Sequence, residues 1–186
     1  MKNTNISIIV IAAIITLAVP AIGYVAFGYI PAVLFLVGYL SGFMLWLVVP
    51  THGSFTSIRI WFWVTFLLFI GHRVEEKVSG FFDTLAEMTG VAKPEIISIP
   101  IILLLIVSVG AWILAPVLAS KKHPLGYFLV WTFFASMGIT ELAHFIFPLF
   151  RDQPYGYFPG MLSVIVLAPC AWIGMYKFSN ANKVTV

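Results

Sequence analysis

Five ionisable residues lie inside stretches that are apolar enough to cross a membrane. His72, Glu75 and Glu76 fall near the end of one stretch, FIGHRVEEKV. Glu141 and His144 fall within another, GITELAHFIF. A charge costs roughly 2.5–3.5 kcal/mol at the centre of a membrane helix on insertion scales, and the charges found there usually face a partner, an ion or a water-filled cavity. We therefore expect these five residues to carry the chemistry of the protein.

The spacing of these residues places them on shared helix faces. Residues three or four positions apart lie on one face of a helix. His72 can align with Glu75 or with Glu76, and these two glutamates point about 100° apart around the helix axis. Glu141 and His144 also share a face, and Glu-x-x-His is the spacing with which helix bundles hold carboxylate-bridged metals. Glu75 and Glu76 are thus expected to have different roles.

The imidazole and carboxylate groups of these clusters suit zinc, iron or manganese. A catalytic zinc uses three protein ligands and keeps one position open, as in sites with two histidines and one glutamate. We assign the metal ligands to His72, Glu76 and His144. We assign the catalytic role, proton transfer, to Glu75 and Glu141.

The number of carboxylates favours zinc over a di-iron centre. A di-iron site in a helix bundle takes about four carboxylates and two histidines. Only the three glutamates are well placed, and Asp83 could supply a fourth carboxylate only if its loop folds back. The alternative for Glu75 and Glu76 is pairing along the helix near the membrane surface. For Arg73 and Lys77 we expect an anchoring role in the lipid headgroups.

The composition indicates a polytopic membrane protein. Of the 186 residues, 61% are hydrophobic and 9% are charged, whereas soluble domains have about 25% charged residues. A water-exposed globule is therefore excluded. The net charge of +3 comes without a basic run or patch, so we expect membrane lipids as partners and no nucleic acid. The single cysteine, Cys170, excludes an intrachain disulfide and is expected to be a packing residue.

The apolar residues form runs of roughly 20, the length that crosses about 30 Å of hydrocarbon as a helix. We expect an all-α transmembrane bundle that forms a single domain over residues 1–186. Six spans are predicted, at residues 5–24, 31–50, 59–78, 96–119, 125–150 and 157–178.

The connection at residues 79–94 is the only long one. Phe81, Phe82, Leu85 and Met88 in it are spaced for one helical face, and Gly90 can end the helix. We expect a short helix lying in the membrane interface after the third span. The alternative is a loop folded over the bundle.

Basic residues predict the orientation. On the side of the termini lie Lys2, Arg59, Lys121, Lys122, Lys177 and Lys183, and on the other side lie Lys77, Lys93 and Arg151. This excess predicts a multi-pass protein of the cell membrane with cytoplasmic termini. Alternatively, the first span, which ends near Val19-Pro20-Ala21, is a secretory signal that is cleaved.

Two further patterns concern packing. Six tryptophans fall in the half of their spans nearer the termini, and this predicts an aromatic belt at one interface: Trp46, Trp61, Trp63, Trp112, Trp131 and Trp172. Gly38-x-x-x-Gly42 permits close helix contact, either within the bundle or between two copies of the chain. The oligomeric state is left open.

The predicted directions of the spans bring the two polar clusters together. The third and fifth spans both run from the side of the termini towards the outer side. The His72 cluster lies near the outer end of one of them, and the Glu141 cluster lies in the outer half of the other. We therefore expect the clusters to meet at one site that is open to the outer leaflet.

The string His72-Arg73-Val74-Glu75-Glu76 resembles the defining motif of the HXXEE family of small bacterial membrane proteins. That family is also similar to this chain in a late histidine, an arginine and a Tyr-x-Pro-Gly turn before the last span. These positions are His144, Arg151 and the turn Tyr157-Phe158-Pro159-Gly160. The residues 152–156 make a longer insertion than the family pattern has. The resemblance supports the choice of site residues and implies no reaction.

The function that these residues favour is a metal-dependent enzyme acting on a lipid or other amphipathic substrate. Its divalent metal would activate a water molecule, and a glutamate would move protons. One alternative is a small transporter or proton-coupled carrier that uses the same residues, although the chain shows no repeated halves with broken helices. Another is a non-catalytic partner within a larger membrane complex.

Overall fold

The computed structural model describes residues 5–50, 54–90, 93 and 97–180, and every regular element in them is helical. The all-α fold class is thus confirmed for the described residues. The α-helices are α1 (Ile6–Phe27), α2 (Tyr29–Val48), α3 (Arg59–Val78), α4 (Phe81–Thr89), α5 (Ile99–Leu105), α6 (Ala111–Ser120), α7 (Pro124–Gly138), α8 (Ala143–Ile146) and α9 (Met161–Asn180). Short 3-10 turns lie at Phe55–Ser57, Thr140–Leu142 and Phe147–Phe150, and a π turn at Ile106–Gly110 joins α5 to α6.

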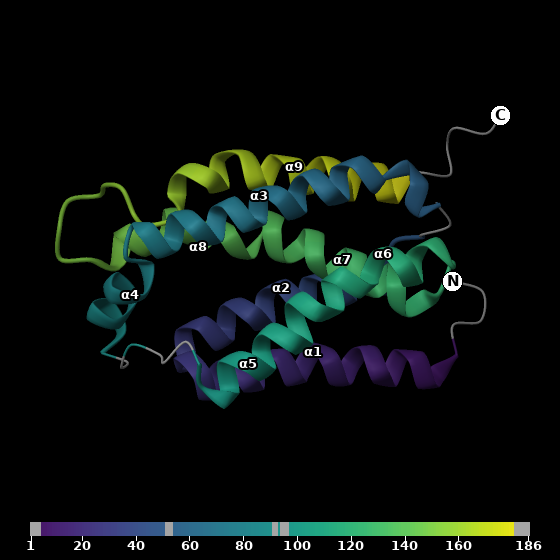
Figure 1. The fold of residues 1–186 in the computed structure, drawn as a ribbon, viewed down its shortest axis with the longest axis horizontal. Helices are drawn as coiled ribbons and strands as arrows, with labels where there is room; N and C mark the ends of the chain where they lie inside the picture. The colour runs from purple at the N-terminus through teal and green to yellow at the C-terminus, as the bar shows by residue number, and fades with distance from the viewer. Residues whose placement is uncertain (1–4, 51–53, 91–92, 94–96, 181–186) are drawn as a thin grey trace.

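The long helices lie side by side along the long axis of the molecule (Figure 1). The start of α1 and the end of α9 lie at one end, and α4 and α8 lie at the other. Helix α7 is central, with contacts to α2, α6 and α9, while α3 packs along α9. The carboxyl-terminal ends of α3 and α7 therefore lie at the same end of the bundle, as predicted from their directions.

Five helical segments of the described chain are long and apolar enough to cross a membrane, and these indicate a multi-pass membrane protein. They are Ile6–Phe27, Tyr29–Val48, Ile99–Ser120, Pro124–Phe150 and Met161–Asn180. The sixth predicted span is α3, which has 20 residues but carries Arg59, Arg73, Glu75, Glu76 and Lys77. Its charges distinguish it from the other five, and α3 does not have the apolar composition of a membrane span.

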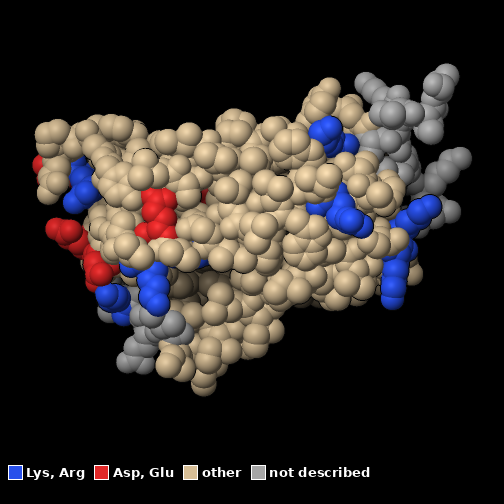
Figure 2. All heavy atoms as spheres, turned by 45° about the horizontal axis from the view of Figure 1, so that its top comes forward, with Lys and Arg blue, Asp and Glu red and all other residues tan. Residues whose placement is uncertain are grey.

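The charges on the surface differ between the two ends. In the view of Figure 2, only Lys and Arg gather near the end at which α1 starts, whereas acidic side chains appear near the other end. This distribution agrees with the basic excess that the sequence places on the side of the termini. Lys2 and Lys183, which contribute to that excess, lie outside the described residues.

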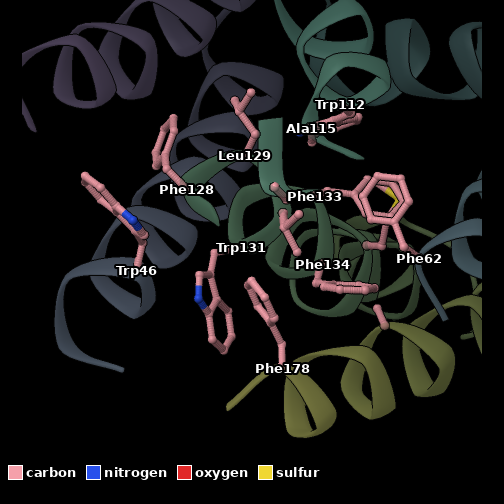
Figure 3. Packing of buried hydrophobic residues seen from close by; sticks show 14 of the residues in the cluster. Trp46, Phe62, Trp112, Ala115, Phe128, Leu129, Trp131, Phe133, Phe134 and Phe178 are labelled. Carbon is pink, nitrogen blue, oxygen red and sulfur yellow. The ribbon is translucent and has the colours of Figure 1, made fainter. Parts of the chain in front are cut away.

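The core between the helices is strongly aromatic (Figure 3). Trp46, Trp112 and Trp131 are only 2%, 5% and 2% exposed and belong to this core. The predicted aromatic belt is therefore wrong for these three residues. Their indoles add large contact areas inside the bundle, whereas Trp63 and Trp172 are 41% and 45% exposed.

Helix α4 is the short helix expected after the third span, and Gly90 ends it in the left-handed conformation, with a φ of 67°. Phe81 and Leu85 are buried and pack with Ala143, Phe147 and Phe158. Helix α4 thus covers the end of the bundle, as the alternative interpretation of residues 79–94 supposed.

The two glycines of Gly38-x-x-x-Gly42 pack against α7 and the turn that follows it. A Cβ at Gly38 would meet Thr140 Oγ1 at 2.5 Å, and one at Gly42 would meet Thr132 Cα at 2.4 Å. Contact within the bundle therefore explains this motif without a second copy of the chain.

Gly42→Ala is expected to lower the melting temperature in detergent, because its methyl group would force α2 away from the α7 backbone. Overpacking of this kind costs about 1–3 kcal/mol. Gly71→Ala is the matched control, since a Cβ there meets nothing within 4 Å and alanine favours a helix over glycine by about 1 kcal/mol. Equal melting temperatures for the two variants would contradict the close packing.

Candidate metal centre

The structure brings together four of the five predicted site residues. His72 and Glu76 come from one face of α3, four positions apart. Glu141 lies in the 3-10 turn Thr140–Leu142, and His144 follows in α8. Their exposed fractions are only 0%, 2%, 7% and 3% in the order His72, Glu76, Glu141, His144. We call these four residues the quartet.

A break in the fifth predicted span turns Glu141 and His144 towards α3. Helix α7 ends at Gly138, and the chain continues as a 3-10 turn. The Trp172 indole N–H donates to the Gly138 carbonyl at 2.6 Å, so a carbonyl freed by the end of the helix keeps a partner. The break places the Glu141 and His144 side chains in the interior of the bundle, where both are buried.

Each histidine of the quartet faces both carboxylates. His72 Nε2 lies 3.4 Å from Glu76 Oε1 and 3.1 Å from Glu141 Oε2. His144 Nε2 lies 3.3 Å and 3.2 Å from the same two oxygens. Four tetrahedral ligands at about 2.0–2.1 Å from a zinc ion are about 3.3–3.4 Å apart. These four of the six distances among the ligand atoms therefore match edges of a zinc-sized tetrahedron. All four ligand atoms lie within 4.8 Å of one another.

The outer nitrogens of both imidazoles are held by hydrogen bonds. His144 Nδ1 lies 2.6 Å from the Pro159 carbonyl, which can only accept, so Nδ1 carries the proton. His72 Nδ1 lies 2.8 Å from Ser163 Oγ, whose own hydroxyl donates to the Gly160 carbonyl at 3.2 Å. When the imidazoles are neutral, both Nε2 atoms thus direct a lone pair towards the carboxylates, which is the tautomer that metal-binding histidines adopt. When they are protonated, the Nε2–H groups donate to the same oxygens.

Arg73 joins the two carboxylates from the other side. Its Nη1 lies 2.6 Å from Glu76 Oε2, and its Nη2 lies 2.5 Å from Glu141 Oε1. Each glutamate thus gives one oxygen to the guanidinium and the other to the histidines. The anchoring role expected for Arg73 is wrong, because its ionic partners are the buried carboxylates. Its spacing of three positions from Glu76 is the one sequence signal that could have indicated this contact.

The quartet and Arg73 carry an unbalanced charge. One guanidinium against two carboxylates leaves one negative charge when both imidazoles are neutral. Glu76 Oε1 is also a buried atom with no hydrogen-bond donor among the described residues. Uncompensated charge and unpaired polar atoms are costly in a buried site. A cation between the four ligand atoms, either a metal ion or added protons on the histidines, would remove both deficits.

The turn Tyr157-Phe158-Pro159-Gly160 supports the two imidazoles. Phe158 is fully buried, and its ring lies 6.0 Å from that of His144. Gly160 has a φ of 94°, and a Cβ there would lie 2.6 Å from His144 Nδ1 and 2.9 Å from His72 Cε1. Glycine is needed at this position because the backbone passes directly beside both rings.

Glu75 lies outside the quartet, at the amino-terminal end of α9. Its carboxylate accepts from the Tyr157 hydroxyl and the Ser163 backbone N–H, both at 2.8 Å. Negative charge is favourable at a helix amino terminus, where free N–H groups point outwards. Partial desolvation and the neighbouring carboxylate raise the pKa of the Tyr157 phenol, which therefore stays protonated and donates.

Asp83 also lies apart from the quartet. It is exposed and pairs with Lys93 at 2.6 Å, so helix α4, in which it lies, does not bring a further carboxylate to the site. The quartet consists of two histidines and two glutamates. That set is short of the four carboxylates of a di-iron centre.

A cavity of about 100 Å³ adjoins the quartet. Arg73, Glu76, Glu141 and His144 line one side of it, and α4 covers it through Phe81 and Phe82. A molecule in this cavity would therefore lie beside Glu76, Glu141 and His144 of the quartet.

Comparisons with protein-family models, with curated proteins and with solved structures gave no match to this chain. The resemblance to the HXXEE family therefore rests on the motifs themselves. The quartet is consistent with that motif, because it contains the histidine and the second glutamate of His72-x-x-Glu75-Glu76.

Arg73→Gln is expected to lower the free energy of unfolding by about 3–5 kcal/mol, because it leaves two buried carboxylates without their cation. Chemical unfolding in mixed detergent micelles would measure the change. Lys77→Gln, at an exposed position of the same helix, should change the stability by less than about 0.5 kcal/mol. If both variants had the same stability, the Arg73 bridge would be refuted.

Proposed function

We propose that the chain is a six-span membrane protein whose quartet binds one divalent metal ion, zinc rather than a di-iron pair, and that it is a metal-dependent hydrolase. His72, Glu76 and His144 are permanent ligands. Glu141 would be the fourth residue to hold the ion, and its carboxylate would also be placed to accept a proton from a bound water molecule. The proposed substrate is a lipid or another amphipathic molecule.

The observation that carries this proposal is the orientation of the two imidazoles. Their Nδ1 atoms are engaged by Ser163 and Pro159, so both Nε2 atoms face the carboxylate oxygens at 3.1–3.4 Å, and neutral imidazoles would direct lone pairs at them. Lone pairs that face one another repel unless a cation lies between them. A metal ion satisfies all four groups at once with its ordinary bond lengths.

The other residues around the quartet have clear supporting roles in this proposal. A metal ion in such a site supplies a Lewis acid and lowers the pKa of a bound water molecule. Arg73 holds the outer oxygen of Glu141 and keeps its inner oxygen directed at the centre. Phe81 packs on His144 with ring centroids 5.2 Å apart, so α4 limits the access of water to the site.

Glu75 has a positioning role in this proposal, in place of the proton transfer that the sequence suggests. Its carboxylate binds the backbone N–H of Ser163, and the Ser163 hydroxyl in turn accepts from His72. A change at Glu75 would therefore act on the metal site through α9. Glu75→Gln should keep the metal, because the amide oxygen can still accept hydrogen bonds.

A proton-coupled carrier remains the second candidate. It is supported by the Arg73 side chain, which is 43% exposed while it contacts two buried glutamates. Such a network could exchange a proton with the surroundings, with the missing positive charge supplied by a histidine instead of a metal. Metal content separates the two candidates.

Purified protein is expected to contain about one zinc ion per chain by elemental mass spectrometry after dialysis against metal-free buffer. The double variant His72→Ala, His144→Ala should contain almost none, because half of the ligands are lost. Asp83→Asn is the control, since this carboxylate pairs with Lys93 and lies outside the quartet. Equal, near-zero contents in wild type and double variant would refute the metal site and favour the carrier.

The six-span topology predicts that the two ends of α3 lie on opposite sides of the membrane. Ser57→Cys and Lys93→Cys, each in a Cys170→Ala background, replace exposed residues that precede and follow this helix. In intact cells, a membrane-impermeant maleimide should label position 93 and leave position 57 unlabelled until the cells are opened. Labelling of both positions from the same side would show that α3 does not cross.

A further inference from the structure

The cavity beside the quartet has one polar wall and one apolar wall. The polar wall comes from α3 and residues 140–144, with Arg73, Glu76, Glu141 and His144. The apolar wall comes from α1, α2, α4 and the Phe147–Phe150 turn, and includes Phe27, Pro31, Leu34, Phe82, Leu85 and Phe147. An occupant would therefore need a polar group at one side and a hydrocarbon group at the other.

The size of the cavity limits that hydrocarbon group. Its volume is about 100 Å³, about two thirds of a cavity of about 150 Å³ that binds the six carbons of benzene. The cavity thus has room for about three or four methylene-sized groups. A complete lipid tail does not fit, so a longer chain would have to continue out of the cavity.

The surroundings of the apolar wall indicate where such a chain would go. Val25 and Ile30, which flank the turn between α1 and α2, are 70% and 39% exposed. The rings of Phe27 and Phe82 stack at 5.7 Å and connect α1 with α4 at the edge of the cavity. A chain that leaves the cavity past this stack would meet apolar side chains that face the bilayer.

We infer that the site selects an amphiphile by the first three or four carbons next to its reacting oxygen group. The inference rests on the proposed metal site: the oxygen group binds the metal, and these carbons lie between Leu34 and Phe82. Any further chain extends past Phe27 into the membrane. Leu34 and Phe82 thereby determine the specificity.

Alkyl hydroxamates test this inference, because their head group binds zinc while the alkyl length can be varied. The binding of acetohydroxamate and pentanohydroxamate to zinc-loaded protein would be measured by calorimetry, with chelator-treated protein as the reference. Each buried methylene strengthens binding about fourfold. The three additional methylenes of pentanohydroxamate should strengthen it roughly 60-fold.

Leu34→Trp should fill the cavity and abolish most of this gain while acetohydroxamate still binds. Leu40→Trp, at a 44% exposed position of the same helix, should keep the full gain. Partition of the ligands into micelles is the same for both variants and cancels in the comparison. A second variant, Phe82→Ala, enlarges the cavity and should extend the gain to longer chains.

The outcomes separate this inference from the proposed function. Wild type without zinc would overturn the metal site, and this inference with it. Wild type that holds zinc and binds acetohydroxamate, but gains nothing from the longer chain, would overturn the inference alone. An equal gain in wild type, Leu34→Trp and Phe82→Ala would also overturn it.

Discussion

The rest of the structure depends on one constraint: the two imidazoles and the two carboxylates of the quartet face one another in the interior of a membrane bundle. Their nitrogen and oxygen atoms lie 3.1–3.4 Å apart. Without a cation between them, each of these buried polar groups would need a water molecule as its partner. The guanidinium of Arg73 contacts both carboxylates and neutralises one of their two charges. The remaining negative charge has to be balanced by a cation, and this requirement defines the site.

The surrounding elements hold this arrangement in place. Helix α3 supplies two ligand residues and Arg73, the break after α7 supplies the other two, and the turn before α9 holds the imidazoles from behind. Gly160 lets the backbone pass directly beside both rings. The adjacent glutamates of α3 point to different partners: Glu76 faces the quartet, whereas Glu75 binds the start of α9. The motif His72-x-x-Glu75-Glu76 therefore supplies two residues of the quartet and one residue, Glu75, that holds α9 in place beside it.

Much of the fold and the choice of residues could be predicted from the sequence. Long apolar runs require helices in a bilayer, and helical spacing aligns His72 with Glu76 and Glu141 with His144. The direction of the helices places both pairs at one end. Tryptophan position was a weaker guide, because an indole near a helix end fits an aromatic core as well as an interface. In the structure, Trp46, Trp112 and Trp131 are buried in the aromatic core.

By itself, then, the sequence determined the helical class, the end of the bundle at which the polar residues lie and the pairing of residues along each helix, because these follow from local periodicity and hydropathy. Only the tertiary structure decided which groups meet across helices. Arg73 binds Glu141, which is 68 positions away in the sequence. Glu75 binds the start of α9, and Ser163 lies within hydrogen-bond distance of His72 Nδ1. Such contacts depend on how the helices rotate and bend against one another, and no local pattern encodes that.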